Sequence, residues 1–296
     1  MAFKTLVRCL TPILVFLFPV FCLIPPACAD VIYYRTGGTL KGLIVEEHRD
    51  RVVVSTEEGE KPILRGDIDE VFYDDAERNY LYLGNEALAL REFAMAKGLF
   101  RKALQIFPRF QEAEDALHRL EDLKLKEESG FKAHDPLEAL HEQWGLNLSR
   151  QGQKWVVVQG AAEGLLAYRS GIASGDALVS FWGDSLAYLN VVEVAETLVG
   201  PPGSAVKLTL SREVSLPGDA TPGITLSMQR LGLTVAAVGP LGRAGRTGLV
   251  PGDRIVAMDG KSTRYLPFSQ ARRILQEAGE RGTVLLIHRD RMIRRE

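Results

Sequence analysis

The side chains best suited to metal or acid–base chemistry lie in one short segment near the middle of the chain. His134, His141 and Glu142 are close in sequence, and the His-Glu pair is the first half of the zinc motif H-E-x-x-H. Gly145 stands where that motif needs its second His. We therefore predict no metal site and no cofactor.

A nucleophilic site is equally poorly supported. Ser174 and Ser204 lie next to glycines, but serine is common at such turn positions. The sequence contains no G-x-S-x-G elbow, and the glycines between Gly242 and Gly248 do not have the spacing of a nucleotide-binding loop. We expect a protein that is not an enzyme.

The amino-terminal segment has the composition of a targeting signal. Residues 1–29 contain Lys4 and Arg8, two apolar runs and then Ala27-Cys28-Ala29, which is the three-part pattern of a signal peptide. All three cysteines lie in this segment, so no disulfide framework is available further on. We predict export to the periplasm of a Gram-negative bacterium. Membrane attachment remains an alternative, through lipidation of Cys28 or an uncleaved segment.

The rest of the chain must position any binding site. Its 296 residues are 25% charged and 46% hydrophobic, which excludes disordered and polytopic membrane chains. The pattern changes several times, so we expect a multidomain α+β protein. Residues 30–75 contain short β-branched runs between turn residues, at Val31–Tyr34, Thr39–Val45, Arg51–Thr56 and Glu70–Tyr73. This spacing predicts a small antiparallel β-barrel.

Residues 77–128 have a helical pattern. The residue types at seven positions resemble those of one tetratricopeptide (TPR) repeat: Tyr80, Leu83, Gly84, Ala96, Phe100, Ala103 and Pro108. Small residues would let two antiparallel helices approach, and Phe100 would fill the space between them. A third helix at about Gln111–Lys126 would cap this TPR-like hairpin. One repeat is too short for a solenoid, so we interpret the segment as a spacer.

The second half contains an internal repeat with a shift of 77 residues. Both copies carry small, glycine and aliphatic residues at matching positions and end in a helical stretch and a strand. The first copy has Val158, Ala161, Ala167, Gly171, Gly175, Asp176 and Gly183, and the second has Val235, Val238, Ala244, Gly248, Gly252, Asp253 and Gly260. We predict two copies of one fold.

Each copy resembles a bacterial-type PDZ domain, over about residues 135–213 and 219–290, with the Gly-Asp turns as the most specific feature. The resemblance implies a groove between a strand and the long helix, where a protein C-terminus or extended peptide adds as a strand. In the first copy, it implies these groove residues: Trp144, Gly145, Leu146, Asn147, Leu148, Val191, Val194, Ala195 and Leu198. Gly145 would let backbone N–H groups face a carboxylate.

The second copy departs further from the pattern. By spacing, its loop contains Pro222, Gly223 and Ile224, and proline has no N–H to offer a carboxylate. We expect the first groove to be the better candidate for tail recognition, although Gly223 and Ile224 belong to the equivalent site. The second groove could be vestigial, structural or filled by an internal strand.

Charge is distributed unevenly. The chain has a formal net charge of −2, yet residues 223–296 hold 13 Lys or Arg against 6 Asp or Glu. This asymmetry suggests internal docking, an acidic partner or anionic head groups, and a solvated basic tail is an equally simple interpretation. Nucleic acid fits poorly, because aromatic residues do not alternate with the basic ones.

These observations favour a non-catalytic, exported interaction scaffold that binds C-terminal or extended peptides by strand addition. One alternative is a regulatory or substrate-sensing subunit of an envelope protease or secretion machine. Another is a structural envelope protein whose modules only pack against each other.

Overall fold

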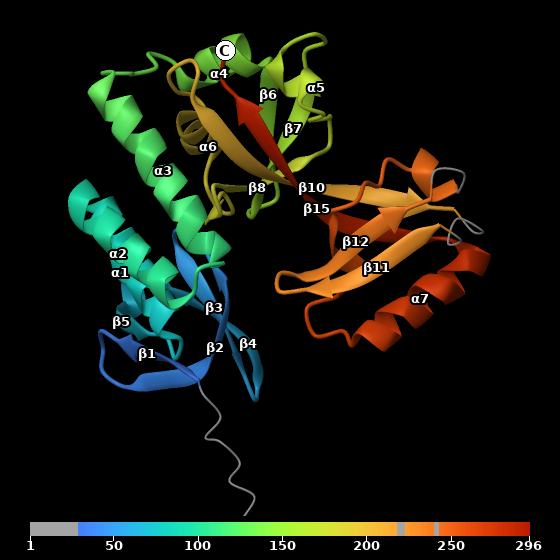
Figure 1. Ribbon diagram of the computed structural model, residues 1–296, viewed down its shortest axis with the longest axis horizontal. Coiled ribbons are helices and arrows are strands. Elements are labelled where there is room, and N and C mark those ends of the chain that lie inside the picture. Colours follow the sequence, from blue (N-terminus) through green and yellow to red (C-terminus); the bar gives the residue numbers. More distant parts are fainter. Residues whose placement is uncertain (1–28, 218–222, 240–242) are drawn as a thin grey trace, which may run out of the picture.

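The computed structural model describes residues 29–217, 223–239 and 243–296. The predicted signal peptide therefore lies outside the described residues, except for Ala29. A β unit, a helical unit and two similar α/β modules follow one another along the chain (Figure 1). None of the helices in the described ranges has the length and apolar character needed to cross a bilayer.

The β unit is an antiparallel sheet of five strands in the order β4-β3-β2-β1-β5. The strands are β1 (Asp30–Tyr34), β2 (Thr39–Glu47), β3 (Arg51–Thr56), β4 (Gly59–Leu64) and β5 (Ile68–Phe72). Ile32, Val52 and Val54 are buried in its core. Sequence analysis did not anticipate β4, because its exposed residues and Pro62 give no alternating pattern; proline is tolerated there since β4 is an edge strand.

The helical unit contains α1 (Ala76–Ala89), α2 (Phe93–Ile106) and α3 (Gln111–Glu128). Phe100 is fully buried between α1 and α2, where Gly84 leaves room for its ring. A Cβ atom on Gly84 would lie 2.4 Å from the Phe100 ring. The small residue at this position is thus required by the packing, as the helical pattern predicts.

The first module follows α3. Its elements are α4 (Pro136–Trp144), β6 (Leu146–Gln151), β7 (Trp155–Ala161), α5 (Leu166–Arg169), β8 (Ala177–Phe181), β9 (Asp184–Ser185), α6 (Val191–Leu198) and β10 (Ala205–Leu216). Helix α4 begins with a strong signal: Asp135 caps it, accepting from the N–H groups of Leu137 and Glu138, and Pro136 occupies its first turn.

The second module repeats this order without a counterpart of α4 among the described residues. Its elements are β11 (Ile224–Gln229), β12 (Gly232–Val238), a 3-10 turn (Arg243–Arg246), β13 (Arg254–Met258), β14 (Lys261–Ser262), α7 (Phe268–Arg281) and β15 (Thr283–Arg294). Both modules have the same irregularity in the first strand pair, which joins Leu146 to Ala161 and Leu148 to Val158 in one module and Ile224 to Val238 and Leu226 to Val235 in the other.

A buried ion pair also repeats. Arg212 donates from Nε and Nη2 to the two carboxylate oxygens of Asp176, at 2.6 Å each. Arg289 bonds Asp253 in the same way and at the same distances. Each carboxylate also accepts from a backbone N–H three residues earlier, of Ala173 or Val250, and so holds the Gly-Asp turn. The predicted internal repeat therefore extends to its polar core.

The two modules share one sheet. Strands β10 and β15 pair along their full lengths, from Ala205 opposite Arg294 to Leu216 opposite Thr283. They form the centre of the order β11-β12-β13-β15-β10-β8-β7-β6 (Figure 1). Val206 and Ile293 belong to the first core, whereas Val214, Leu216, Leu285 and Ile287 belong to the second. The domain limits predicted from the repeat are 135–213 and 219–290. Their carboxy-terminal ends, residues 213 and 290, therefore fall within the paired strands β10 and β15.

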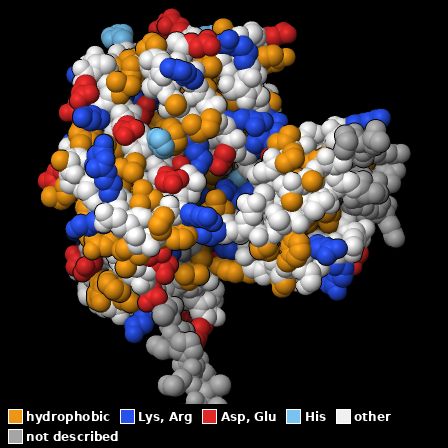
Figure 2. Space-filling view, viewed as in Figure 1, with side chains coloured by type: hydrophobic (Ala, Val, Ile, Leu, Met, Phe, Trp, Pro, Cys, Tyr) orange, Lys and Arg blue, Asp and Glu red, His pale blue; other side chains and the backbone are white. Residues whose placement is uncertain are grey.

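Charged contacts tie the other units to the modules. Asp115 of α3 accepts from Lys207 of β10 at 2.8 Å, and Lys126 of α3 donates to the carbonyl of Thr197 in α6. On the face seen in Figure 2, basic and acidic side chains lie close together where the second module meets the rest of the molecule. Arg264, Arg230 and Arg295 of the basic segment pair with Glu46, Glu112 and Asp122, so internal docking accounts for part of the charge asymmetry.

Candidate functional site

An open groove lies in the second module, between β11 and α7. Its volume is about 440 Å³. It is lined by Ile224, Thr225 and Leu226 from the strand and by Phe268, Arg272, Leu275 and Gln276 from the helix. Strand β11 ends the sheet order and pairs only with β12 within the described ranges, so its other edge carries unpaired backbone groups beside the groove.

The helix supplies the apolar floor and the polar rim of the groove. Ala271 and Leu275 are buried against the second core, and Phe268 is partly buried beside them. Arg272 and Gln276 are exposed. Helical spacing of four residues places Phe268, Arg272 and Gln276 along one face, above the buried residues.

Gly223, the predicted loop residue, directly precedes β11. Gly223 has a φ of 137°, and its carbonyl accepts from the N–H of Gly239. A Cβ atom on Gly239 would lie 3.3 Å from the Cα of Gly223, so a side chain at Gly239 would crowd the backbone there. Ile224 follows and lines the groove. Of the two residues predicted for the second copy, Ile224 lines the groove and Gly223 precedes it in the chain.

Most of the equivalent residues of the first module are buried. Trp144, Val194, Ala195 and Leu198 are fully buried, Leu146 is 2% exposed, and all five pack in one cluster with Leu140. Leu148 and Val191 are partly buried against this cluster, and Asn147 is exposed. Most of the predicted residues are therefore brought together, but around side chains of α4 rather than around an open pocket.

Gly145 has a left-handed conformation, with a φ of 70°, and it ends helix α4. Its N–H donates to the carbonyl of His141 at 2.8 Å, and its carbonyl accepts from Ala162. A Cβ atom here would lie 2.7 Å from the Cβ of Leu165. The N–H of Gly145 is therefore used within α4, and the residues predicted for this groove pack against α4.

The candidate catalytic residues are not assembled into a site. Ser174 donates to the carbonyl of Gln159, and Ser204 donates to the carbonyl of Pro201. No group of three or more His, Cys, Asp or Glu residues in the described part of the chain could hold a metal ion. Both serines hold turns.

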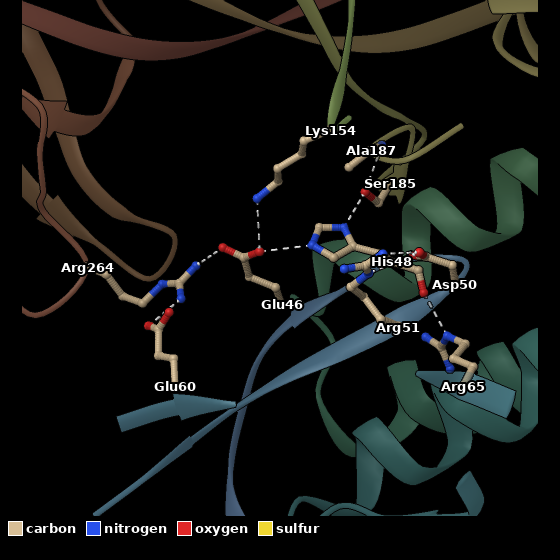
Figure 3. A network of polar contacts seen from close by, with 10 residues as sticks. All are labelled: Glu46, His48, Asp50, Arg51, Glu60, Arg65, Lys154, Ser185, Ala187 and Arg264. Carbon is tan, nitrogen blue, oxygen red and sulfur yellow. Dashed lines mark hydrogen bonds and ion pairs between the residues drawn. The ribbon is translucent and has the colours of Figure 1, made fainter. Parts of the chain in front are cut away.

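A polar network joins the β unit to both modules (Figure 3). Glu46 of β2 accepts from Lys154 at 3.3 Å and from Arg264 at 2.6 Å, and it contacts His48 Nε2 at 2.9 Å. The His48 contact is the largest of several that hold the pKa of Glu46 well below its usual range, against the opposing effect of burial. No local pattern indicates this network, because Lys154 and Arg264 lie 108 and 218 residues from Glu46.

In the same network, Ser185, His48 and Glu46 are linked by consecutive hydrogen-bond contacts. Ser185 Oγ lies 2.7 Å from His48 Nδ1, and His48 bonds Glu46 on its other side. Residues of these types form hydrolytic triads. Here, however, Glu46 is shared with two cations, and Ser185 Oγ also accepts from the N–H of Ala187. The arrangement fits the docking of three units.

A larger hollow, of about 1240 Å³, lies between the β unit, the helical unit and the first module. Several charged groups on its walls already have protein partners. Arg119 donates to Asn85 and to the carbonyl of Trp182, and Arg65 donates to the carbonyl of His48. The groove beside β11 is therefore the better candidate for a binding site.

No family model matches the chain, and the search of curated proteins found no match. Solved structures similar to parts of it include PDZ domains with peptide ligands. A choanoflagellate SHANK1 PDZ domain bound to a GIRK3 peptide is 25% identical over 28% of this chain and 93% of that domain, with a TM-score of 0.24. INAD PDZ45 in complex with an NG2 peptide is 19% identical over 50% of this chain and 83% of that one, with a TM-score of 0.24.

A photosystem II D1 C-terminal processing protease is also similar. It is 15% identical over 51% of this chain, with a TM-score of 0.23, and the match spans 49% of that protease. The structural neighbours thus include PDZ domains with peptide ligands and one protease. The likeness is low in each case, so we base the site on the register, burial and groove of this chain.

Proposed function

We propose that this protein is a non-catalytic interaction scaffold whose second module binds an extended or C-terminal peptide by strand addition. The observation that carries this proposal is the unpaired edge of β11 beside the groove under α7. Backbone groups along such an edge bind any extended chain, and the groove selects its side chains. Gly223 and Ile224 stand at the start of this site.

The ligand need not end in a free carboxylate. The residue before Gly223 is Pro222, which has no N–H to donate. We therefore expect a peptide acid and its amide to bind with affinities within about threefold of each other, since no charge-assisted hydrogen bond distinguishes them.

A matched pair of α7 variants tests the proposal. Gln276→Trp places an indole in the groove, whereas Gln270→Trp makes the same change on an exposed position of α7 that does not line it. Phage displaying random C-terminal heptapeptides should enrich a common sequence pattern on the wild type and on Gln270→Trp, but not on Gln276→Trp. Absence of enrichment on the wild type contradicts the proposal. Enrichment that persists on Gln276→Trp assigns the ligand elsewhere, with the first module as the next candidate.

The predicted site of the first module would open only if α4 withdrew. We propose that Trp144 and Leu198 there stabilise the core, together with Leu140 of α4. This assignment fits their complete burial.

We infer export from the pattern of residues 1–29. Amino-terminal sequencing of the protein from a periplasmic fraction should give Asp30 as the first residue. Recovery of the intact chain from the cytoplasm contradicts export. Proteins that co-purify with the wild type and not with Gln276→Trp then identify the partner, including any protease or secretion component.

A further inference from the structure

The groove of the second module contains one charged side chain, Arg272. It lies on α7 between Phe268 and Gln276, which are four residues away on either side, and it is exposed. Across the groove stand Ile224, Thr225 and Leu226. A ligand strand beside β11 would therefore pass the guanidinium.

Arg272 has no hydrogen bond or ion pair with any residue that the structure describes, and this distinguishes it from several arginines around it. Arg264 binds Glu46 and Glu60, Arg273 binds Glu277, and Arg230 binds Glu112. A guanidinium carries five N–H donors and is always charged, and it matches a carboxylate in geometry. Arg272 is thus available to a ligand.

The remaining lining of the groove is largely apolar. Leu275 is 6% exposed, and Ile224, Leu226 and Phe268 are partly buried against the second core. Apolar side chains of a ligand would therefore lie on either side of the position that faces Arg272. The equivalent helix position in the first module, 77 residues earlier, is the buried Ala195, so the charge is particular to the second module.

The spacing of the helix matches that of a bound strand. Four residues of an α-helix rise about 6 Å, and side chains on one face of a strand repeat every two residues, or about 6.6 Å. Phe268 lies four residues from Arg272, a rise of about 6 Å, and Leu275 lies three residues from it on the other side, a rise of about 4.5 Å. Successive ligand side chains on the groove face would therefore meet Leu275, Arg272 and Phe268 in turn. This correspondence is the same for both directions of the ligand strand.

We propose that the second groove selects acidic peptides with the pattern apolar-x-acidic-x-apolar, in which the Asp or Glu binds Arg272. This inference rests on the proposed function of the groove and specifies its ligand. The excess of basic residues in segment 223–296 would favour the approach of such a peptide.

Three pools of fluorescein-labelled pentapeptides test the inference on the full chain. Their central residue is Glu, Gln or Lys, the neighbours are Thr, and the outer positions are equal mixtures of Val, Leu, Ile and Phe. Fluorescence anisotropy should show the wild type binding the Glu pool about three- to tenfold more tightly than the Gln pool, as for a partly exposed ion pair. It should bind the Lys pool most weakly.

Arg272→Glu should reverse this order, and Arg273→Glu, one residue along on an exposed position outside the groove, should keep it. If all pools bind equally, and Gln276→Trp abolishes that binding, the acidic preference is wrong while the groove remains a peptide site. If no pool binds the wild type, the proposed function fails as well. An unchanged circular-dichroism melting curve for each variant shows that folding is not the cause.

Discussion

Arg295 of the carboxy-terminal strand segment donates from Nη1 to Oδ1 of Asp122 in α3, and both side chains are buried. Arg295 also donates to the carbonyl of Leu198 at 2.9 Å and to Ser204 Oγ at 2.8 Å. One guanidinium thus contacts α3 of the helical unit, the end of α6 and Ser204, the residue that precedes β10. This residue belongs to the basic tail of the sequence, yet it is 1% exposed and internally paired.

We predict that Arg295→Ala strongly destabilises the protein. Removal of one member of a buried ion pair costs about 3–5 kcal/mol, and we expect a loss near the lower end because Asp122 keeps a contact with Lys126 at 3.4 Å. Urea unfolding measures this difference. Arg294→Ala is the control, because Arg294 is exposed, and it should change the free energy of unfolding by less than about 0.5 kcal/mol. Equal effects of the two variants would show that the Asp122 contact does not stabilise the fold.

Two glycines of the helical unit should respond oppositely to alanine. Gly84→Ala places a Cβ against the Phe100 ring, so we expect a loss of about 1–3 kcal/mol. Gly98→Ala meets nothing within 4 Å in an exposed part of α2, so we expect a gain of about 1 kcal/mol from helix propensity. Thermal unfolding distinguishes them, and a stabilising Gly84→Ala would contradict the packing of α1 on α2.

Glu46 should control how the second module docks on the β unit. Glu46→Gln removes the charge that Lys154 and Arg264 share, whereas Glu60→Gln leaves that charge in place. Hydrogen exchange in residues 261–267 should accelerate more in Glu46→Gln than in Glu60→Gln. Because the folded-state pKa of Glu46 is lowered, its contribution is complete above about pH 4.5 and is lost as the pH falls further. Identical exchange in the wild type and Glu46→Gln would contradict this role.

His288 should make the protein less stable in mild acid. Burial is the main cause that lowers its pKa to about 4, and the nearby Arg254 lowers it further. Below the unfolded-state pKa of about 6.5, the unfolded chain binds a proton that the folded chain does not, so stability decreases from about pH 6.5 to 4 by up to about 3 kcal/mol. Urea unfolding of His288→Gln should show a shallower pH dependence over this range. A slope unchanged from that of the wild type would show that another group titrates.

The Ser185-His48-Glu46 contacts should have no hydrolytic function. We expect neither the wild type nor Ser185→Ala to release soluble fragments from unfolded casein. Release by the wild type that Ser185→Ala abolishes would overturn the non-catalytic assignment. Ser174→Ala provides a control, because its hydroxyl is bonded to the carbonyl of Gln159.

Sequence analysis recovered the features that local pattern determines. The helical hairpin followed from small residues such as Gly84 and from Phe100, and the internal repeat followed from the Gly-Asp turns. It missed α4, although Asp135 and Pro136 are a standard helix start, because the segment was interpreted only as a loop before a strand. Helix α4 was therefore missing from the predicted surroundings of Trp144 and Gly145.

Other features could not be predicted because they depend on tertiary structure. Nothing local to Glu46 indicates that Lys154 and Arg264 approach it, since they lie 108 and 218 residues away. The role of Arg272 likewise depends on which strand faces its helix. Gly223 and Ile224 were identified through spacing alone, and their groove partners on α7 were missed, although the shift of 77 residues maps Val191 and Leu198 onto Phe268 and Leu275.

Strands β10 and β15 each contribute side chains to both cores, and this has a consequence for folding during synthesis. Because Ile293 packs in the first core, that module stays incomplete during translation until the ribosome has added and released β15. A nascent chain stopped near residue 280 would expose the apolar flank of β10, which proteases and chaperones recognise. Synthesis arrested before β15 would then yield a degradable fragment in which neither core is complete.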